Sequence, residues 1–310
     1  MAKNSRVWLV GLLTAVLTLA ASGCLPTWIG TRSLRHEAAA VGLTERFLKT
    51  ETATVRFWVG GEGPPLVLVH GFGGTGLSTW AKQMSLAEHH TLVVPDLAWF
   101  GQSVSERQPT LDTQVEVLLD LMEALSLDPV DVVGVSYGGF VVLELVQAAP
   151  NRVGRAVIVD SPGPFFGQGR VEELLVRAGV DSLVELFVPE DAAGVDRLFT
   201  IALAEPPRIP RWLLSGLVGS FLSAHPEQQA ALLADLLARS GTVDSASLVW
   251  PEDMLVVWGA SDQVFPTDCG RELAAAASAE FVLLEQAAHS PNIDTPDAFN
   301  RVVSQFLERR

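Results

Sequence analysis

The sequence contains few cysteines, few basic residues and few charged residues of any kind. Two cysteines in 310 residues are too few for a disulfide scaffold or a structural zinc site. Only 21 residues are Lys or Arg against 36 Asp or Glu, a net charge of −15 with no basic stripe, so nucleic-acid binding is not expected. Because 48% of the residues are apolar and 18% charged, a disordered chain is excluded.

The N-terminal segment has the pattern of an export signal. Two basic residues precede an uncharged run over residues 7–21, which is too short to span about 30 Å of hydrocarbon comfortably. Small residues and then Cys24 follow, which resembles a bacterial lipobox, although Ala21 stands where the family prefers Leu. The resemblance implies a signal peptide over residues 1–23 and lipid attachment to Cys24. Plain secretion and an uncleaved anchor are the alternatives.

A lipid on Cys24 predicts a membrane-anchored lipoprotein of the cell envelope. The residue after Cys24 is Leu25, whereas an Asp at this position retains some Gram-negative lipoproteins at the inner membrane. The outer membrane is therefore favoured if the organism has one. Cleavage after residue 23 removes two basic residues and no acidic one, so the mature charge becomes −17. Cys269 is then the only free thiol, and we expect it to be buried rather than reactive.

Short apolar runs alternate with helical patterns along most of the mature chain, which predicts an α/β fold with a mostly parallel sheet flanked by helices. Residues 24–50 lack a strong strand pattern and are assigned to a tether with a short helix. Strands are expected at Thr54–Val59, Leu66–Val69, Thr91–Val94, Val130–Val133, Ala156–Val159, Met254–Trp258 and Phe281–Leu284. Helices are expected near Leu111–Leu125, Phe140–Ala149, Arg271–Ala277 and Pro296–Leu307.

The alternation stops between residues 163 and 249. This insertion has the pattern of several helices, at Arg170–Ala178, Ser182–Phe187, Ala192–Ala204, Arg211–Phe221 and Glu227–Ala238. It predicts a helical cap, or lid, over the carboxyl edge of the sheet, where ligands bind in such folds. Residues 51–162 and 250–310 then form one α/β core.

A Gly-x-Ser-x-Gly pentapeptide, residues 134–138, follows one predicted strand and opens a helix. In this context the pattern predicts that Ser136 is a nucleophile on a sharp, strained turn. A hydroxyl is a poor nucleophile unless a base lies beside it. Of the six histidines, His289 follows the last strand and completes the order serine, acid, histidine, so it is the predicted base.

The acid that orients the base should also follow a strand. Asp262 follows the last strand but one, and Asp160, at the end of the strand before the insertion, is its rival. We prefer Asp262 and expect a structural hydrogen-bonding role for Asp160. The His-Gly-Phe-Gly-Gly loop at 70–74 is a plain tight turn or an oxyanion loop; in the second case the donors are the N–H groups of Phe72 and Tyr137.

These motifs, in this order, resemble the α/β-hydrolase superfamily of serine hydrolases over about residues 50–309. Within it the chain is similar to the monoacylglycerol-lipase-type branch of membrane-associated lipases and esterases. That similarity rests on His70-Gly71-Phe72, on Val257-Trp258-Gly259 before Asp262-Gln263-Val264, and on the cap segments 186–189 and 206–210. One departure from the family pattern, Trp99-Phe100, concerns either the pocket mouth or only the surface.

The resemblance implies an enzyme that cleaves carboxylic esters through an acyl-enzyme intermediate. Its substrate would be an acylglycerol, another lipid-like ester or a short-chain ester, and no cofactor or metal is expected. A hydrolase of C–C bonds in ring-cleavage products has a similar pattern, and a non-catalytic ligand-binding lipoprotein on the same fold is the second alternative. The sequence leaves the substrate open, because the pocket shape depends on how the cap packs.

Overall fold

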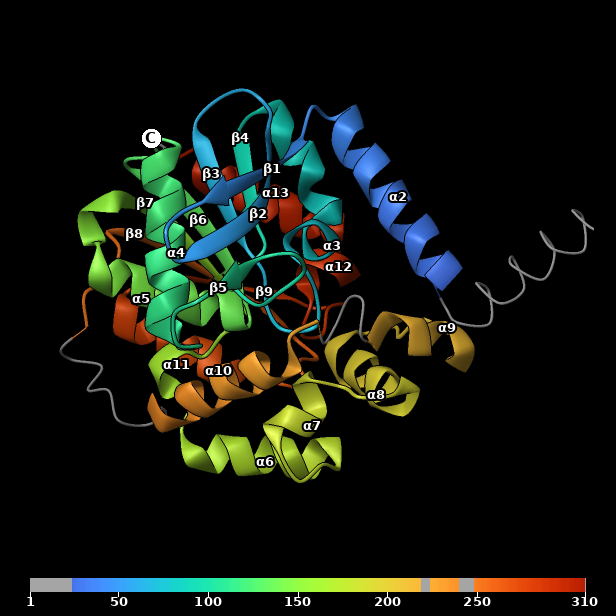
Figure 1. Ribbon diagram of the computed structural model, residues 1–310. Coiled ribbons are helices and arrows are strands. Elements are labelled where there is room, and N and C mark those ends of the chain that lie inside the picture. Colours follow the sequence, from blue (N-terminus) through green and yellow to red (C-terminus); the bar gives the residue numbers. More distant parts are fainter. Residues whose placement is uncertain (1–23, 219–223, 240–247, 310) are drawn as a thin grey trace, which may run out of the picture.

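The computed structural model describes residues 24–218, 224–239 and 248–309, so the predicted signal peptide, residues 1–23, lies outside the described residues. A nine-stranded sheet occupies the centre of the molecule (Figure 1), in the order β1-β2-β4-β3-β6-β7-β8-β9, with β5 paired to β2. The strands are β1 (Thr44–Lys49), β2 (Ala53–Gly60), β3 (Pro65–Val69), β4 (Thr91–Pro95), β5 (Val104–Ser105), β6 (Val130–Val135), β7 (Val153–Val159), β8 (Asp253–Gly259) and β9 (Glu280–Leu284).

The sheet is parallel from β4 through β3 and β6 to β9, and antiparallel at β1, β2 and β5. Its central strands are apolar on both faces because helices cover both sides; Val67 and Leu68 of β3, for example, belong to different core clusters. Each strand predicted from an apolar run is present, and the predicted fold class is confirmed.

Helices pack on both faces of the sheet. One face carries α4 (Leu111–Ala124), α5 (Tyr137–Ala148) and α11 (Thr267–Ala277). The other carries α3 (Gly76–Thr79), the 3₁₀ helix η1 (Ala81–Glu88) and α13 (Pro296–Leu307), with α12 (Pro291–Asp294) just before it. The helices predicted between the strands are therefore confirmed.

The insertion forms helices, as predicted. They are α6 (Gln168–Ala178), α7 (Leu183–Phe187), α8 (Ala192–Ala202), α9 (Arg211–Leu217) and α10 (Pro226–Arg239), and Figure 1 shows them grouped below the sheet. Cap side chains contact the loop after β3: the rings of Phe187 and Phe72 lie 6.2 Å apart. The cap therefore lies over the carboxyl ends of the parallel strands.

The assignment of residues 24–50 to a tether is wrong in one respect. This segment forms a 17-residue helix, α2 (Cys24–Ala40), and then the edge strand β1, which pairs with β2 from Thr44–Val59 to Lys49–Thr54. An edge strand with both faces largely exposed has no apolar run, so its sequence carries little strand signal. Helix α2 packs against α9, α3 and η1, and thus contacts both cap and core.

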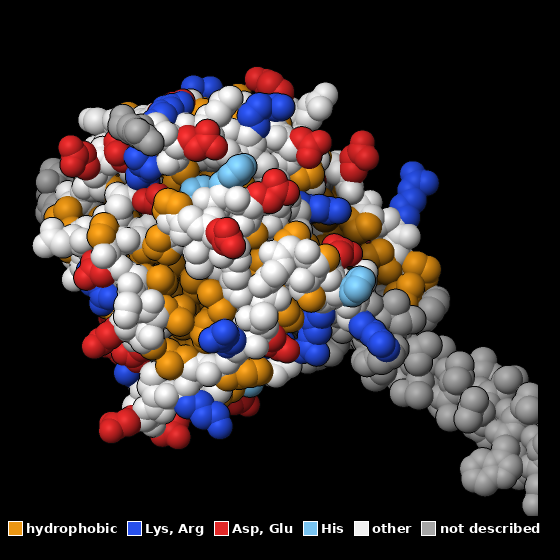
Figure 2. Space-filling view, turned by 90° about the horizontal axis from the view of Figure 1, so that it is seen from above, with side chains coloured by type: hydrophobic (Ala, Val, Ile, Leu, Met, Phe, Trp, Pro, Cys, Tyr) orange, Lys and Arg blue, Asp and Glu red, His pale blue; other side chains and the backbone are white. Residues whose placement is uncertain are grey.

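Within the described ranges, no helix is both long enough and apolar enough to span a membrane. Acidic and basic side chains are interspersed over the face that Figure 2 shows. Cys269 is buried in α11, as expected, and burial raises the pKa of its thiol to about 11. The thiol is therefore protonated at neutral pH, which argues against a reactive role.

Candidate active site

Ser136 occupies a sharp turn between β6 and α5. Its backbone has φ 54° and ψ −120°, a strained region for a residue with a side chain, and its N–H donates to the carbonyl of Val159 at 2.9 Å. A Cβ on Gly134 would lie 2.4 Å from the carbonyl oxygen of Gly138, and one on Gly138 would lie 2.3 Å from that of Val69. Both glycines of the pentapeptide are thus required by close backbone approach.

The three residues predicted to share the chemistry lie together. His289, in the loop between β9 and α12, places Nε2 2.9 Å from Ser136 Oγ and Nδ1 3.0 Å from Asp262 Oδ2. The other oxygen of Asp262 accepts the N–H groups of Val264 at 2.7 Å and Phe265 at 3.0 Å. An ionised carboxylate only accepts hydrogen bonds, so the imidazole proton lies on Nδ1 and the lone pair of Nε2 faces the serine hydroxyl. This arrangement can remove a proton from Ser136.

The rival acid, Asp160, lies beside Asp262 rather than far from the site. Asp160 is fully buried at the end of β7, and its Oδ1 accepts the N–H of Gly259 at 2.9 Å. Burial, and then the charge of Asp262, raise the pKa of Asp160 well above its ordinary value. Its other oxygen, Oδ2, is buried with no hydrogen-bond partner among the described residues, which favours the neutral, protonated carboxyl. Asp160 therefore has a structural role, as the acceptor for the backbone of Gly259, beside the acid that contacts His289.

We expect Asp160→Asn to stabilise the protein relative to the native chain at high pH. Because burial raises the pKa of Asp160, folding retains a proton that the unfolded chain releases above about pH 4, so stability falls as pH rises. Asparagine keeps the hydrogen-bonding shape without this titration. Unfolding midpoints at pH 5 and pH 8 should show the gain growing with pH. The exposed control Asp196→Asn should show no such trend, and a gain independent of pH would contradict the protonated state of Asp160.

The two candidate oxyanion donors lie on adjacent segments. Tyr137 is the first residue of α5, so its N–H is one of the donors that the first turn of a helix leaves unpaired. The rings of Phe72 and Tyr137 pack edge to face, with centroids 4.9 Å apart. Although an oxyanion would bind only their backbone N–H groups, these side chains fix the two segments against each other.

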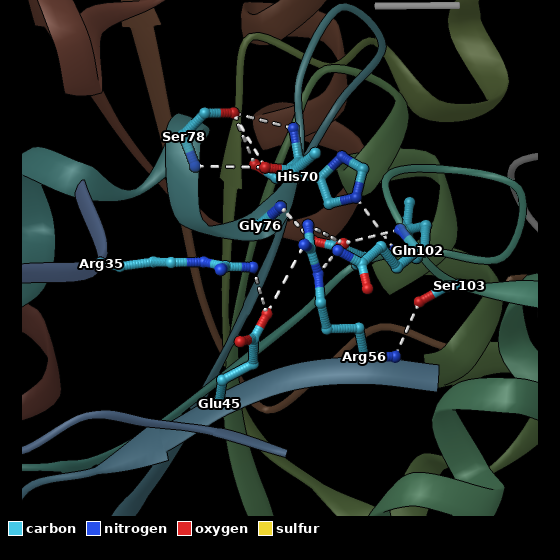
Figure 3. A network of polar contacts seen from close by, with 11 residues as sticks. Arg35, Glu45, Arg56, His70, Gly76, Ser78, Gln102 and Ser103 are labelled. Carbon is cyan, nitrogen blue, oxygen red and sulfur yellow. Dashed lines mark hydrogen bonds and ion pairs between the residues drawn. The ribbon is translucent and has the colours of Figure 1, made fainter. Parts of the chain in front are cut away.

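A buried polar network supports the loop that carries Phe72 (Figure 3). His70 is fully buried; its Nε2 accepts the N–H of Leu97 at 2.9 Å, so the proton lies on Nδ1, which donates to the carbonyl of Gly71 at 2.8 Å. Burial lowers the pKa of His70 and keeps the ring neutral. With both ring nitrogens engaged, His70 positions the loop and is not a base for Ser136.

Asp96 has a structural role. Its buried carboxylate accepts from Arg56 Nε at 2.7 Å and from the N–H of Gly76 at 2.9 Å. Arg56 also lies 3.6 Å from Glu45 of β1, which in turn pairs with Arg35 of α2 at 3.0 Å (Figure 3). A buried carboxylate requires such partners, and here they connect the N-terminal segment to the chain just beyond the 70–74 loop.

Trp99 and Phe100 lie in the interior, so the suggestion that they lie only on the surface is wrong. The ring of Phe100 is 5.1 Å from that of His70 and 5.0 Å from that of Phe72. The carbonyl of Trp99 accepts from Gln229 of cap helix α10 at 3.1 Å. The Phe100 ring therefore packs against the 70–74 loop, whereas the hydrogen bond to the cap uses only the backbone of Trp99.

Sequence reasoning missed Asp294, at the end of α12. Its Oδ2 accepts the N–H of Ala288, the residue before His289, at 2.9 Å, and the N–H of Ala204 in the cap at 3.1 Å. Burial raises the pKa of this carboxyl. One side chain thus links the cap to the histidine loop. Its only sequence signal is an acidic residue five positions after His289, which does not distinguish it from an ordinary surface acid.

Two cavities border Ser136. The first, of about 110 Å³, is also lined by Gly71, Leu198, Ala202 and His289, and we call it the histidine-side cavity. The second, of about 20 Å³, is lined by Ser136 and otherwise by apolar and aromatic side chains, among them Phe72, Phe140 and Phe166; we call it the aromatic slot. Among the described residues, no cluster of three or more His, Cys, Asp or Glu side chains is placed to hold a metal ion.

Comparison with known proteins agrees with this geometry. A sequence model of the alpha/beta hydrolase fold family matches residues 64–296. The chain belongs to this family. The match begins just before β3, so α2, β1 and β2 lie outside it.

Relatives of the chain differ in their reactions. It is 28% identical, over 80% of its length and 88% of the relative, to a 2-hydroxymuconate semialdehyde hydrolase from Pseudomonas sp. (strain CF600). A candidate lipase from Acinetobacter baumannii AYE superposes with a TM-score of 0.78 at 22% identity, covering 89% of this chain and 95% of the other. The structure of a bacterial membrane phospholipase A superposes with a TM-score of 0.80 at 20% identity, covering 99% of this chain and 98% of the other. At these identities the two structures establish the shared fold.

Proposed function

We propose that the protein is a serine hydrolase of carboxylic esters, with Ser136 as nucleophile, His289 as general base and acid, and Asp262 as the orienting acid. The observation that carries the proposal is the continuous hydrogen-bonded chain from Ser136 Oγ through the imidazole to Asp262, at 2.9 and 3.0 Å. It ends at a serine that borders two cavities, so a substrate has room on either side of the reacting carbonyl.

Each step uses groups of the chain and water. Ser136 attacks the ester carbonyl while His289 Nε2 takes its proton, and the carboxylate of Asp262 stabilises the imidazolium that forms. The N–H groups of Phe72 and Tyr137 hold the oxyanion of the tetrahedral intermediate. The imidazolium then protonates the departing alcohol, and His289 activates a water molecule that releases the acyl group from Ser136.

Hydrolysis of a C–C bond in a ring-cleavage product is the second candidate, because the Pseudomonas relative is named as a hydrolase of 2-hydroxymuconate semialdehyde and one similar structure as a meta-cleavage product hydrolase. The non-catalytic reading has no comparable support, since a binding protein has no need of the aligned serine, histidine and aspartate. A substrate panel tests the choice. Purified protein should hydrolyse p-nitrophenyl and acylglycerol esters, and turnover of ring-cleavage products without turnover of esters would overturn the ester proposal.

We further propose that Cys24 carries a lipid and anchors the mature protein to an envelope membrane, the outer one where there are two. Supporting this, the small residues and the cysteine follow an export pattern. The substrates of the anchored protein would then be lipids or other esters that reach that membrane.

Cys24→Ser should abolish incorporation of labelled palmitate and move the protein from the membrane fraction to the soluble one, because the acyl chains supply the membrane affinity. Cys269→Ser is the matched control and should change neither readout, as its thiol is buried. Membrane retention and labelling in the Cys24 variant would contradict the anchor.

A further inference from the structure

A third cavity lies behind the aromatic slot, and no step of the proposed mechanism uses it. This rear chamber, of about 300 Å³, is lined by Leu111, Leu143, Pro164 and Trp250 together with Glu144 and Arg239. Phe140, Phe166 and Leu236 line both the slot and the chamber. These three side chains, the neck, therefore separate the space that touches Ser136 from a larger one.

The mechanism assigns the two sides of the ester to different cavities. His289 must protonate the departing alcohol, so the alcohol lies in the histidine-side cavity, which His289 lines. The aromatic slot borders Ser136 and both residues that offer oxyanion donors, but His289 is not among its lining residues. The acyl group therefore points into the slot, towards the neck.

The polar groups in the chamber wall are already paired. Arg239 forms ion pairs with Asp112 at 2.6 Å, Asp235 at 3.1 Å and Glu144 at 3.6 Å. The side-chain amide of Gln147 donates to the carbonyl of Val249 at 2.7 Å and accepts its N–H at 2.9 Å. A carboxylate or other polar ligand would have to displace these partners, whereas an apolar one would gain from burial.

We infer that the rear chamber binds the distal part of a long, unbranched acyl chain, which passes through the neck from Ser136. The inference rests on the proposed ester hydrolase function and names its substrate class. The narrow slot admits one alkyl chain more readily than a ring, and the aromatic neck is fixed by ring contacts of 6.0 Å between Phe140 and Phe166 and 5.0 Å between Phe166 and Phe265. Each methylene that reaches the chamber leaves water for apolar surroundings.

The test is the acyl-chain profile of the purified full-length protein with p-nitrophenyl esters from acetate to palmitate. For chains that pass the neck, kcat/KM should rise by up to about fourfold for each methylene. Leu143→Trp fills the chamber from α5 and should lower the ratio of decanoate to acetate turnover by about tenfold or more. Ala202→Trp places the same bulk in the histidine-side cavity and should leave that ratio unaltered.

Phe166→Ala provides a second measurement if the tryptophan variant does not fold. It widens the neck and should raise turnover of a cyclohexanecarboxylate ester relative to decanoate by about tenfold. If the protein hydrolyses the acetate ester but neither variant shifts its ratio of turnover rates, the chamber proposal is overturned and the ester proposal stands. An unmodified protein that hydrolyses no ester in the series would instead overturn the proposed function.

Discussion

Ser136→Ala is expected to lower kcat for ester hydrolysis by about 10⁴-fold or more, because it removes the atom that would carry the acyl group. The loss should be large since the remaining groups, the imidazole and the oxyanion donors, can only assist a direct attack by water. Turnover of p-nitrophenyl butyrate measures kcat. A fluorophosphonate probe measures the nucleophile separately, and it should label the native protein and not the variant.

Ser161→Ala is the matched control for this experiment. Ser161 is a fully buried serine that follows β7, and its Cβ would lie 2.4 Å from a Cβ placed on Gly139 of α5. It therefore packs against the helix that begins with Tyr137, and its hydroxyl forms no hydrogen bond to Ser136, His289 or Asp262. Its variant should retain turnover within about threefold. Probe labelling that survives in Ser136→Ala, with activity within tenfold of native, would assign the nucleophile elsewhere.

The features of this fold that the sequence predicts are those that local physical chemistry determines. A strand buried on both faces must be apolar along its length, so β3, β6 and β8 are visible in the sequence. The same reasoning misses β1, which is held by backbone pairing at an exposed edge and needs no apolar residues. The Gly-x-Ser-x-Gly turn is partly predictable for a related reason: a side chain at Gly134 would clash with Gly138 only four residues on, although Gly138 itself is required by its contact with Val69 of β3.

The residues of the candidate site can be predicted where their order along the chain identifies them. They cannot be predicted where their role depends on contacts that form only in the folded protein. Ser136, Asp262 and His289 each follow a strand of a parallel sheet, and such ends meet at one edge. The roles of Asp160 and Asp294 depend on which backbone N–H groups the folded chain brings to them, from Gly259 in one case and Ala204 in the other. The rear chamber is also not predictable, because its walls come from α4, α5, α10 and the segment before β8.

Asp262→Asn is expected to lower kcat by about 10⁴-fold while leaving the fold intact. The oxygen that accepts from Val264 and Phe265 must remain an oxygen, since both partners are N–H donors. The amide nitrogen of asparagine then faces His289 Nδ1, and because it donates, Nδ1 must accept. The imidazole proton moves to Nε2, which can no longer take the proton of Ser136.

Asp160→Asn is the control for this prediction. It shows whether the loss of activity comes from the changed tautomer of His289 or from the loss of any buried carboxyl near the site. Asp160 forms no hydrogen bond to the imidazole, and its amide replacement can still accept from Gly259, so kcat should stay within about threefold of native. Both variants replace a carboxyl by an amide at adjacent strand ends, and only Asp262→Asn inverts the tautomer of His289. Steady-state kinetics across pH 6–9 would distinguish them, and retained activity in Asp262→Asn with loss in Asp160→Asn would exchange their roles. The expected contrast follows from one geometric fact: of the two carboxyls, it is Asp262 whose oxygen lies 3.0 Å from His289 Nδ1.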